Sequence, residues 1–220
     1  MAKKASDNNW RFERKYALSS EEFLQFERLL MLSDLKVLFP DRSINNCYLD
    51  DVRQSAFTES VEGYAEKIKT RIRWYGSLFS EARPILEFKL KQNHSNKKET
   101  FKLFNTSFSK TTNWDNYIDD LRSFVLEKYQ FKLAENLKPV LLNSYKRSYY
   151  ANFEKTLRLT VDRDLEFRSP LGHLKNKMPH KIDAYIIEIK YNNKEALTNF
   201  SMLKNLGKFS KFTTGVRLVN

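Results

Sequence analysis

Apolar and charged residues alternate along several short stretches of this chain, and the polar positions are nearly all ionisable. In Lys67–Tyr75, Ile72 and Trp74 fall on one side of an extended strand, and the lysines and arginines fall on the other. The same alternation returns at 86–91, 157–162 and 186–191. Because successive side chains of a strand point to opposite faces, each stretch predicts a strand with one apolar face and one ionic face.

Two segments carry apolar residues at helical spacing instead. The first begins at Ser19 or Ser20, either of which suits a helix N-cap, and runs to about Leu32. The second covers roughly residues 113–128. We expect the other elements to be strands at 10–17, 46–50, 64–75, 84–91, 139–150, 156–164 and 181–191, a polar loop at 92–97, and a last helix near 196–205 that stops at Gly207. Residues 57–64 fit neither pattern clearly, and Lys208–Phe212 are expected to form an exposed basic segment.

This β-rich order with inserted helices predicts an α+β fold and argues against a doubly wound parallel sheet. The apolar strand faces need cover, and the two amphipathic helices can supply it from outside. The ionic faces then point inward, around a cavity. Because an unpaired buried ion is strongly unfavourable, such a cavity must contain water, internal ion pairs or an anion.

Composition narrows the class of partner. The chain has 220 residues and a formal net charge of +12, which favours a nucleic acid, a nucleotide, a phosphate polymer or an acidic membrane. We expect a disordered leader at 1–9 and one domain over 10–220. The single cysteine, Cys47, excludes an internal disulfide, and neither a transmembrane run nor a signal peptide is evident. These features predict a cytoplasmic protein.

Absent motifs exclude several common sites. The sequence has no GxxxxGK[ST], no GxGxxG and no paired cysteine–histidine spacing. P-loop, dinucleotide-binding and zinc-site proteins are therefore excluded. His94, His173 and His180 lie in polar, loop-like stretches and are expected at the surface.

Arg71 and Arg73 lie on one strand face about 7 Å apart, close to the spacing of neighbouring phosphates. Each guanidinium can hold phosphate oxygens through two parallel hydrogen bonds. The alternative is an ordinary solvated face, but the repetition of the pattern in other strands favours phosphate binding. We expect alanine at both positions to abolish binding and spare the fold, since unpaired cations around a cavity repel one another.

Carboxylates also occur on the ionic faces. Glu87 shares one such face with Lys89 and Lys91, and Glu188 shares another with Lys190. One carboxylate, together with substrate phosphates and waters, is enough to hold Mg²⁺ or Mn²⁺. The alternative for Glu188 is a plain ion pair with Lys190.

Seven segments, in this order, resemble the vacuolar transporter chaperone (VTC) domain of the triphosphate tunnel metalloenzyme, or CYTH, superfamily: FERKY, KIKTRIRWY, LEFKLK, SYKRSYY, LRLTVDRD, IIEIKY and KFSKFTTGV. The resemblance extends from about Trp10 to Arg217. It implies an antiparallel eight-stranded β-barrel around a basic triphosphate tunnel, with helices packed on the outside. It also implies a divalent metal, Mn²⁺ or Mg²⁺. The VTC branch includes polyphosphate polymerases, which move the γ-phosphate of ATP onto a growing phosphate chain.

The resemblance implies a role for each matching position. As catalytic phosphate contacts we assign Lys15, Arg71, Arg73, Lys89, Arg147 and Arg158. To substrate binding we assign Tyr145, Lys69, Lys91, Lys190, Ser210 and Lys211, of which the last two would close one tunnel mouth. Glu188 and Glu13 would hold the metal. One departure is that Arg11 stands where the wider superfamily has the first Glu of Glu-x-Glu-x-Lys, which argues against a two-metal hydrolytic site.

The function that follows is that of an ATP-dependent polyphosphate polymerase, a metal-dependent phosphotransferase. Its expected partners are ATP, phosphate and polyphosphate, and any link to a membrane would require a separate partner protein. One alternative is a triphosphatase acting on inorganic or nucleoside triphosphate, and another is a non-catalytic module that binds polyphosphate or RNA. Nucleic acid is not expected, because most aromatic residues alternate onto the apolar strand faces and would not stack on bases.

Overall fold

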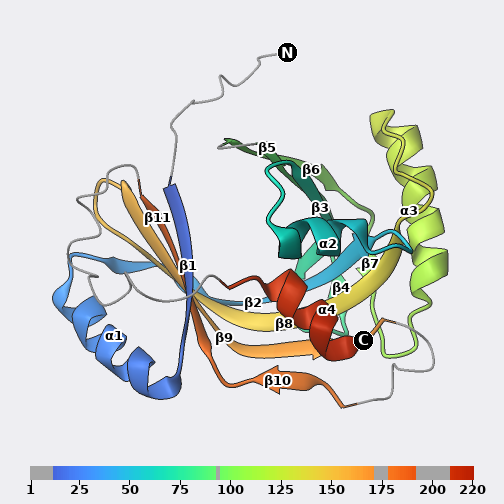
Figure 1. Cartoon of the computed structure of the whole chain (residues 1–220). Coiled ribbons are helices and arrows are strands. Elements are labelled where there is room, and N and C mark those ends of the chain that lie inside the picture. The colour runs from blue at the N-terminus through green and yellow to red at the C-terminus, as the bar shows by residue number, and fades with distance from the viewer. Residues whose placement is uncertain (1–11, 93–94, 171–177, 192–208) are drawn as a thin grey trace. The chain divides into compact units, whose positions relative to one another are not determined.

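The structure is a computed structural model of the 220-residue chain, and it describes residues 12–92, 95–170, 178–191 and 209–220. The elements along the chain (Figure 1) are β1 (Phe12–Leu18), α1 (Ser20–Leu32), β2 (Lys36–Asp50), α2 (Ser55–Glu62), β3 (Lys67–Tyr75), β4 (Glu81–Ala82), β5 (Ile85–Gln92), β6 (Ser95–Lys102), β7 (Thr106–Ser107), α3 (Trp114–Tyr129), β8 (Lys138–Ala151), β9 (Leu157–Arg168), β10 (His180–Ile182), β11 (Tyr185–Tyr191) and α4 (Lys211–Val219). The strand pairs whose registers are defined are antiparallel. The predicted α+β class is confirmed.

The described residues form two compact units. The first unit contains 12–41, 148–162, 184–191 and Phe209, and the second contains 42–92, 95–147, 163–170, 178–183 and 210–220. Strands β2, β8 and β9 contribute residues to both units. The single domain expected over 10–220 stays a prediction.

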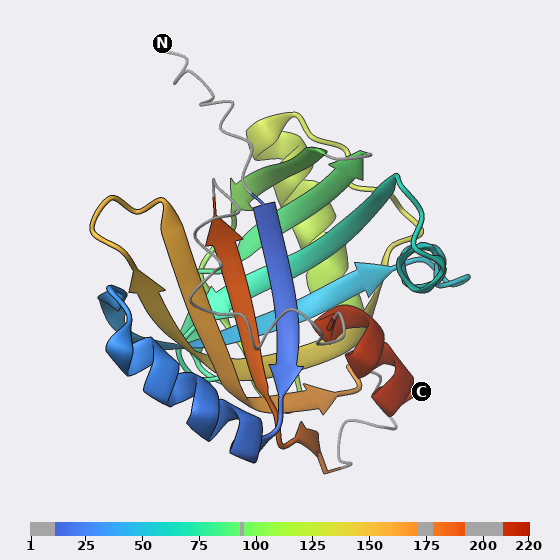
Figure 2. The same cartoon turned by 60° about the vertical axis from the view of Figure 1, so that its left-hand side comes forward.

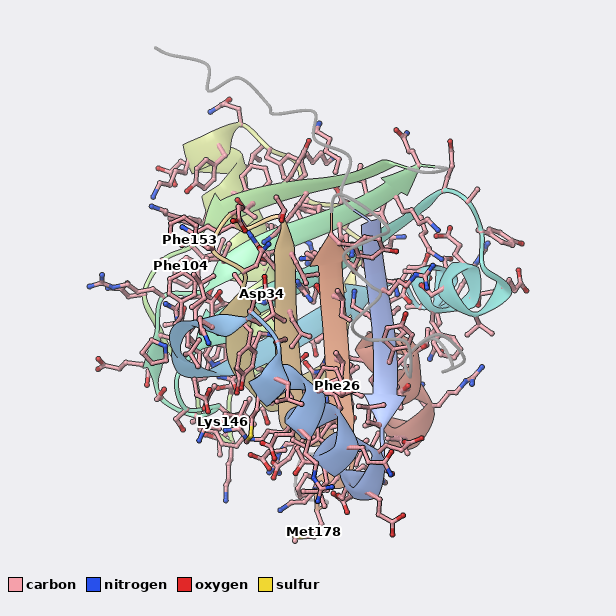
Figure 3. The ribbon with its side chains drawn as sticks, turned by 90° about the vertical axis from the view of Figure 1, so that its left-hand side faces the viewer. Phe26, Asp34, Phe104, Lys146, Phe153 and Met178 are labelled. Atoms are coloured by element: carbon pink, nitrogen blue, oxygen red, sulfur yellow. The ribbon has the colours of Figure 1, made fainter. Side chains whose placement is uncertain are left out.

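In the first unit, β11 lies between β1 and β9, antiparallel to both (Figure 2). Helix α1 begins at the predicted N-cap, where Ser19 and Glu22 form a capping box. Its buried residues, Phe26 and Leu30, pack against the apolar face of these strands, and Phe26 is labelled in Figure 3. The core also contains Tyr16, Leu18, Leu159, Val161, Ile187 and Ile189. Glu13 and Lys15 of β1 and Glu188 and Lys190 of β11 alternate with these core residues and lie on the opposite face.

In the second unit, β2, β3, β5 and β6 are consecutive antiparallel neighbours. Helix α3 covers one face of them (Figures 1 and 2) and has Asn113 as its N-cap, close to the predicted 113–128. The shared core contains Ile72, Trp74, Leu86, Phe88, Trp114, Ile118, Leu121 and Val125. For β3 and β5, which cover two of the predicted alternating stretches, the division into an apolar and an ionic face is therefore confirmed within this unit.

Some predicted boundaries were wrong. The polar loop expected at 92–97 is partly strand, because β6 begins at Ser95 and pairs with β5 through its backbone. The ambiguous segment 57–64 lies mostly in α2, and the strand expected at 181–191 is divided into β10 and β11. The leader at 1–9 and the helix near 196–205 lie outside the described residues.

The segment after Gly207 also differs from the prediction. Ser210 is the N-cap of α4, and Phe212 is 3% exposed, so this part of the chain is not an exposed basic segment. Gly215 lies inside the helix, although glycine is a poor helix former. A Cβ at this position would lie 2.5 Å from both Leu141 Cδ2 and Phe167 Cδ1, so close packing requires glycine.

No helix in the described ranges has the length and apolar character needed to cross a bilayer.

Candidate functional site

The carboxylate–lysine cluster of the first unit consists of Glu13, Lys15, Glu188 and Lys190. Antiparallel pairing of β1 with β11 sets Glu13 opposite Lys190 and Lys15 opposite Glu188, so all four side chains share one face. The Lys15 ammonium forms ion pairs with Glu13 and with Glu188, the latter at 3.2 Å from Oε2. The Lys190 Nζ lies 3.0 Å from Glu188 Oε1 and 3.9 Å from Glu13 Oε2. Four residues predicted from the sequence are thus brought together.

Lys15 is held in its charged form. Burial lowers the pKa of Lys15, but Glu188 and Glu13 outweigh burial and raise that pKa overall. The ammonium therefore stays protonated at neutral pH. An ionised lysine between two carboxylates keeps both negative groups close together without strong repulsion, and it can also contact a phosphate.

Strand β9 extends this face by one row. Its register sets Thr160 opposite Glu188 and Arg158 opposite Lys190. The Thr160 hydroxyl and the Arg158 Nε are buried and have no hydrogen-bond partner among the described residues. A buried polar group without a partner costs about 1–3 kcal/mol, so both atoms are candidates for ligand contacts. Arg158 was predicted, whereas Thr160 was missed, although it lies on the ionic side of the LRLTVD alternation.

The arginine–glutamate cluster of the second unit consists of Arg71, Arg73, Glu87 and Lys98. Glu87 Oε2 accepts a hydrogen bond from Arg71 Nε at 2.7 Å, and a terminal nitrogen of the same guanidinium lies 2.7 Å away. Arg73 approaches this oxygen at 3.6 Å, and Lys98 Nζ lies 2.5 Å from Oε1. The two arginines were predicted as site residues, whereas Glu87 was assigned no role and Lys98 was missed.

Ionisation of Glu87 follows from these neighbours. Burial raises the pKa of Glu87, but Arg71, Arg73 and Lys98 outweigh it and bring the pKa to about 2. For Arg71, burial lowers the pKa, and Tyr48, Glu87 and Tyr145 raise it above the ordinary value. The two arginines are therefore not unpaired cations. The expectation that alanine at both positions would spare the fold is not supported, because it would leave the buried Glu87 carboxylate without two of its partners.

A layer of neutral groups also holds the arginines. The Tyr48 hydroxyl accepts a hydrogen bond from Arg71 at 3.3 Å, and Asn46 Oδ1 accepts one from Arg73 Nε at 3.0 Å. Asn46 in turn donates to Asn143 Oδ1 at 2.9 Å. These three residues were missed. For Asn46, the sequence did offer a signal: it belongs to a pair of amides inside the otherwise apolar strand INNCYL, where a buried amide needs a specific partner.

A third group in the second unit combines cations with aromatic rings. Lys69 Nζ donates to Ser210 Oγ at 3.4 Å, and Lys211 Nζ lies 4.7 Å from the centre of the Tyr145 ring. The Arg147 guanidinium lies 5.3 Å from the same ring. The predicted residues Lys69, Tyr145, Arg147, Ser210 and Lys211 are thus brought together around Tyr145 and the N-terminus of α4.

Lys89 and Lys91, the remaining predicted cations, lie on β5. The pairing of β3 with β5 sets Lys89 opposite Lys69 and Lys91 opposite Lys67. Both predicted residues therefore share the ionic face of Glu87, two and four residues further along the strand.

Metal ligands were predicted at Glu188 and Glu13. No group of three or more His, Cys, Asp or Glu side chains suited to a metal occurs in the part of the chain that the structure describes. Two neighbouring carboxylates nevertheless provide hard oxygen donors, and Mg²⁺ or Mn²⁺ completes its shell with phosphate oxygens and water. The residues present therefore fit a metal that arrives with a phosphate substrate, and the metal site stays a prediction.

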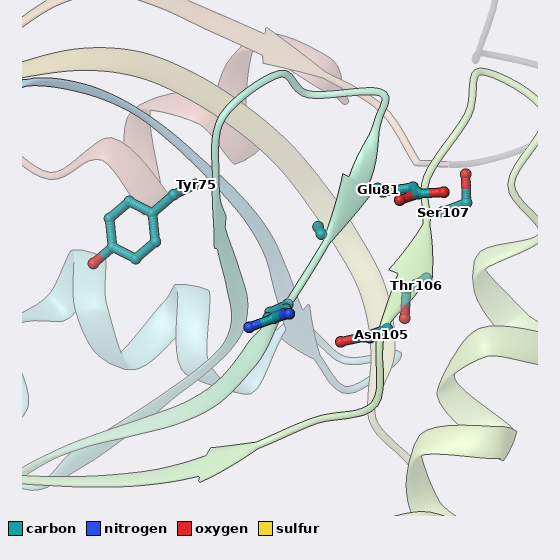
Figure 4. A pocket seen from close by; sticks show the side chains of 7 residues that line it. Tyr75, Glu81, Asn105, Thr106 and Ser107 are labelled. Atoms are coloured by element: carbon teal, nitrogen blue, oxygen red, sulfur yellow. The ribbon is translucent and has the colours of Figure 1, made fainter.

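An open pocket of about 610 Å³ lies elsewhere in the second unit, at the small β4–β7 sheet (Figure 4). Its lining consists of Tyr75, Glu81, Ala82, Arg83, Asn105, Thr106 and Ser107. None of the residues predicted for the site lines it, so the pocket is not part of the candidate site.

Comparison with known proteins identifies the fold and the family. No curated protein sequence matches this chain. A solved structure from Hippeastrum, described as an adenylyl cyclase candidate with a dominant triphosphatase activity, is 16% identical, covers 94% of this chain and 96% of its own, and has a TM-score of 0.51. A proposed adenylate cyclase from Bacillus halodurans is 16% identical, covers 91% of this chain and 94% of its own, and has a TM-score of 0.50. These likenesses show a shared fold. The family model of the VTC domain matches residues 10–220, and the chain therefore belongs to the VTC domain family.

Proposed function

We propose that this protein is an ATP-dependent polyphosphate polymerase that transfers the γ-phosphate of ATP to phosphate or polyphosphate. The observation that carries the proposal is the pair of ionic clusters, each on a strand face opposite a helix-covered core. Membership of the VTC domain family supports the same reading.

The arginine–glutamate cluster supplies fixed donors for phosphate oxygens. Phosphoryl transfer requires little covalent chemistry from a protein, and it depends on alignment and on neutralising the charge of the transferred group. Arg71 and Arg73 are already oriented by Glu87, Tyr48 and Asn46. Their guanidinium groups are suited to a triphosphate, which presents closely spaced anionic oxygens.

The carboxylate–lysine cluster supplies the complementary chemistry. Lys15 and Lys190 can exchange a carboxylate oxygen for a phosphate oxygen, and Glu13 and Glu188 then become available as metal ligands. A bound Mg²⁺ or Mn²⁺ would neutralise charge on the phosphate oxygens. Because an acceptor phosphate is already ionised, the transfer needs no strong general base.

The finer architecture belongs to the same proposal. We propose one domain over 10–220 whose strands close into the eight-stranded tunnel of the family. Support comes from the length of the family match and from the ionic face of each unit. The cytoplasmic location and a separate membrane partner remain predictions.

The test is to incubate the purified protein with ATP and Mn²⁺ and to resolve the products on a polyacrylamide gel stained for polyphosphate. The proposal expects a ladder of long phosphate chains that a polyphosphatase removes. Release of orthophosphate alone would contradict it and would favour a triphosphatase. That alternative is suggested by the activity of the Hippeastrum protein, which shares the fold.

A further inference from the structure

Glu87 is a buried carboxylate with an unusual number of cationic neighbours. Its side chain is only 4% exposed, and Arg71, Arg73 and Lys98 all approach its two oxygens. A buried ion is tolerated only where partners compensate for its lost hydration. A negative charge therefore lies within a surface that, according to the proposed function, binds a polyanion.

The contacts of Glu87 argue against a direct chemical role. Oε2 faces Arg71 and Arg73, and Oε1 faces Lys98 at 2.5 Å. The carboxylate is ionised throughout the neutral range, so it cannot donate a proton there. A proton acceptor or metal ligand would instead need an oxygen that is open to the substrate.

The same contacts fix the guanidinium planes. Arg71 directs Nε and one terminal nitrogen at Glu87 and the other terminal nitrogen at Tyr48. Arg73 is held between Asn46 and Glu87. Donors fixed in advance bind a matching anion without a further loss of side-chain entropy.

We propose that Glu87 is a positioning residue that orients Arg71 and Arg73 for a chain of linked phosphates and thereby favours triphosphate over single phosphate. Glu87 acts through the arginines. Its effect on affinity is largest for a linked phosphate chain, because several oxygens of the chain must accept hydrogen bonds at the same time. The inference rests on the proposed function only in taking tripolyphosphate as the substrate class.

The experiment compares the binding of tripolyphosphate and of orthophosphate by calorimetry, without turnover, in wild type, Glu87→Gln and Glu87→Asp. Loss of the charge alone would strengthen binding most for the more highly charged tripolyphosphate. Loss of orientation weakens the binding of tripolyphosphate in particular. We expect the preference for tripolyphosphate over orthophosphate to fall about tenfold in Glu87→Gln.

Glu87→Asp keeps the charge but shortens the side chain. Its preference for tripolyphosphate over orthophosphate should therefore also fall, by about threefold. It also carries the test if Glu87→Gln does not fold. The matched control is Glu99→Gln on β6, where Glu99 pairs with the exposed Lys97. This variant should keep the wild-type preference for tripolyphosphate over orthophosphate.

An unchanged or increased preference in the Glu87 variants would overturn the inference. If wild type makes no polymer but Glu87→Gln loses the preference for tripolyphosphate, the polymerase is refuted and the role of Glu87 is supported. The two failures are therefore distinguishable.

Discussion

The two ionic clusters differ in how their charges balance. In the first unit, Lys15 and Lys190 face the two carboxylates Glu13 and Glu188. In the second unit, Arg71, Arg73 and Lys98 surround the single carboxylate Glu87. The same alternation of charged and apolar residues has thus produced one nearly balanced cluster and one with excess positive charge.

This difference suits the two clusters to different chemistry. A lysine ammonium is a compact charge on a flexible chain and can exchange partners easily, whereas an arginine held at several nitrogens presents a fixed donor array. The balanced cluster is suited to a metal and a mobile phosphate. The arginine cluster is suited to holding a phosphate chain in one orientation.

The largest effect should come from removing the arginines. Arg71→Ala combined with Arg73→Ala should weaken tripolyphosphate binding by at least about a hundredfold, since charged hydrogen bonds contribute roughly 1.5–3 kcal/mol each. The melting temperature should also fall, because Glu87 remains buried and loses two partners. Calorimetry and thermal unfolding measure the two effects, with the exposed Lys132→Ala as control. Unchanged binding would contradict the assignment of Arg71 and Arg73 as phosphate contacts.

Glu188→Gln should affect metal dependence more than binding. The amide keeps the shape of the side chain but is a poor ligand for Mg²⁺ or Mn²⁺, so metal-stimulated turnover should fall by at least about a hundredfold. Titration of turnover against Mn²⁺ concentration measures the effect, and Glu154→Gln, an exposed position in the same unit, is the control. Retention of full Mn²⁺ stimulation would contradict the assignment of Glu188.

Acid should destabilise the arginine–glutamate cluster. The folded-state pKa of Glu87 is about 2, compared with 4.5 for an unperturbed glutamate, so its stabilising contribution is complete above the unfolded-state value. That contribution, on the order of 2–3 kcal/mol, is lost as the pH falls from about 4.5 towards 2. Urea unfolding between pH 6 and 3 should therefore show a steeper loss of stability in wild type than in Glu87→Gln. Equal slopes would indicate that the pKa of Glu87 is not depressed.

The smallest effect is expected at Thr160. Thr160→Val removes a hydroxyl that has no partner within the described ranges, so the unliganded protein should become more stable by about 1 kcal/mol. Phosphate affinity should fall about threefold if the hydroxyl contacts the ligand. Thermal unfolding and calorimetry measure both changes. A lower melting temperature would show that the hydroxyl serves the fold instead.

Period-two alternation predicted which side chains lie on ionic strand faces, whereas the roles of residues such as Lys15, Arg147 and Ser210 were implied by the family resemblance. That period places Arg71, Arg73 and Glu87 on ionic faces whatever strands are adjacent. The pairing of Arg71 with Glu87, and of Lys15 with Glu188, depends on strand register, which arises from contacts far apart in sequence. The role of Glu87 could therefore not be recognised before its neighbours were known.

Two elements that the sequence did not predict, β6 and α4, have weak local sequence signals. Strand β6 is rich in lysine and polar residues and is formed by pairing with β5, so its side chains carry little strand signal. Helix α4 contains Thr213, Thr214 and Gly215, all weak helix formers, and burial of Phe212 and Val216 compensates. In both cases, tertiary contacts override local preference.

Polymer synthesis by this protein is tested most directly by ³¹P nuclear magnetic resonance of ATP incubated with Mg²⁺ and the purified protein. We expect the γ-phosphate signal to be replaced by the signal of phosphates inside a long chain. This product signal should be absent from both the Arg71→Ala/Arg73→Ala and the Glu188→Gln proteins. Conversion of the γ-phosphate to orthophosphate alone, or polymer formation that survives the loss of either cluster, would contradict the proposed polymerase.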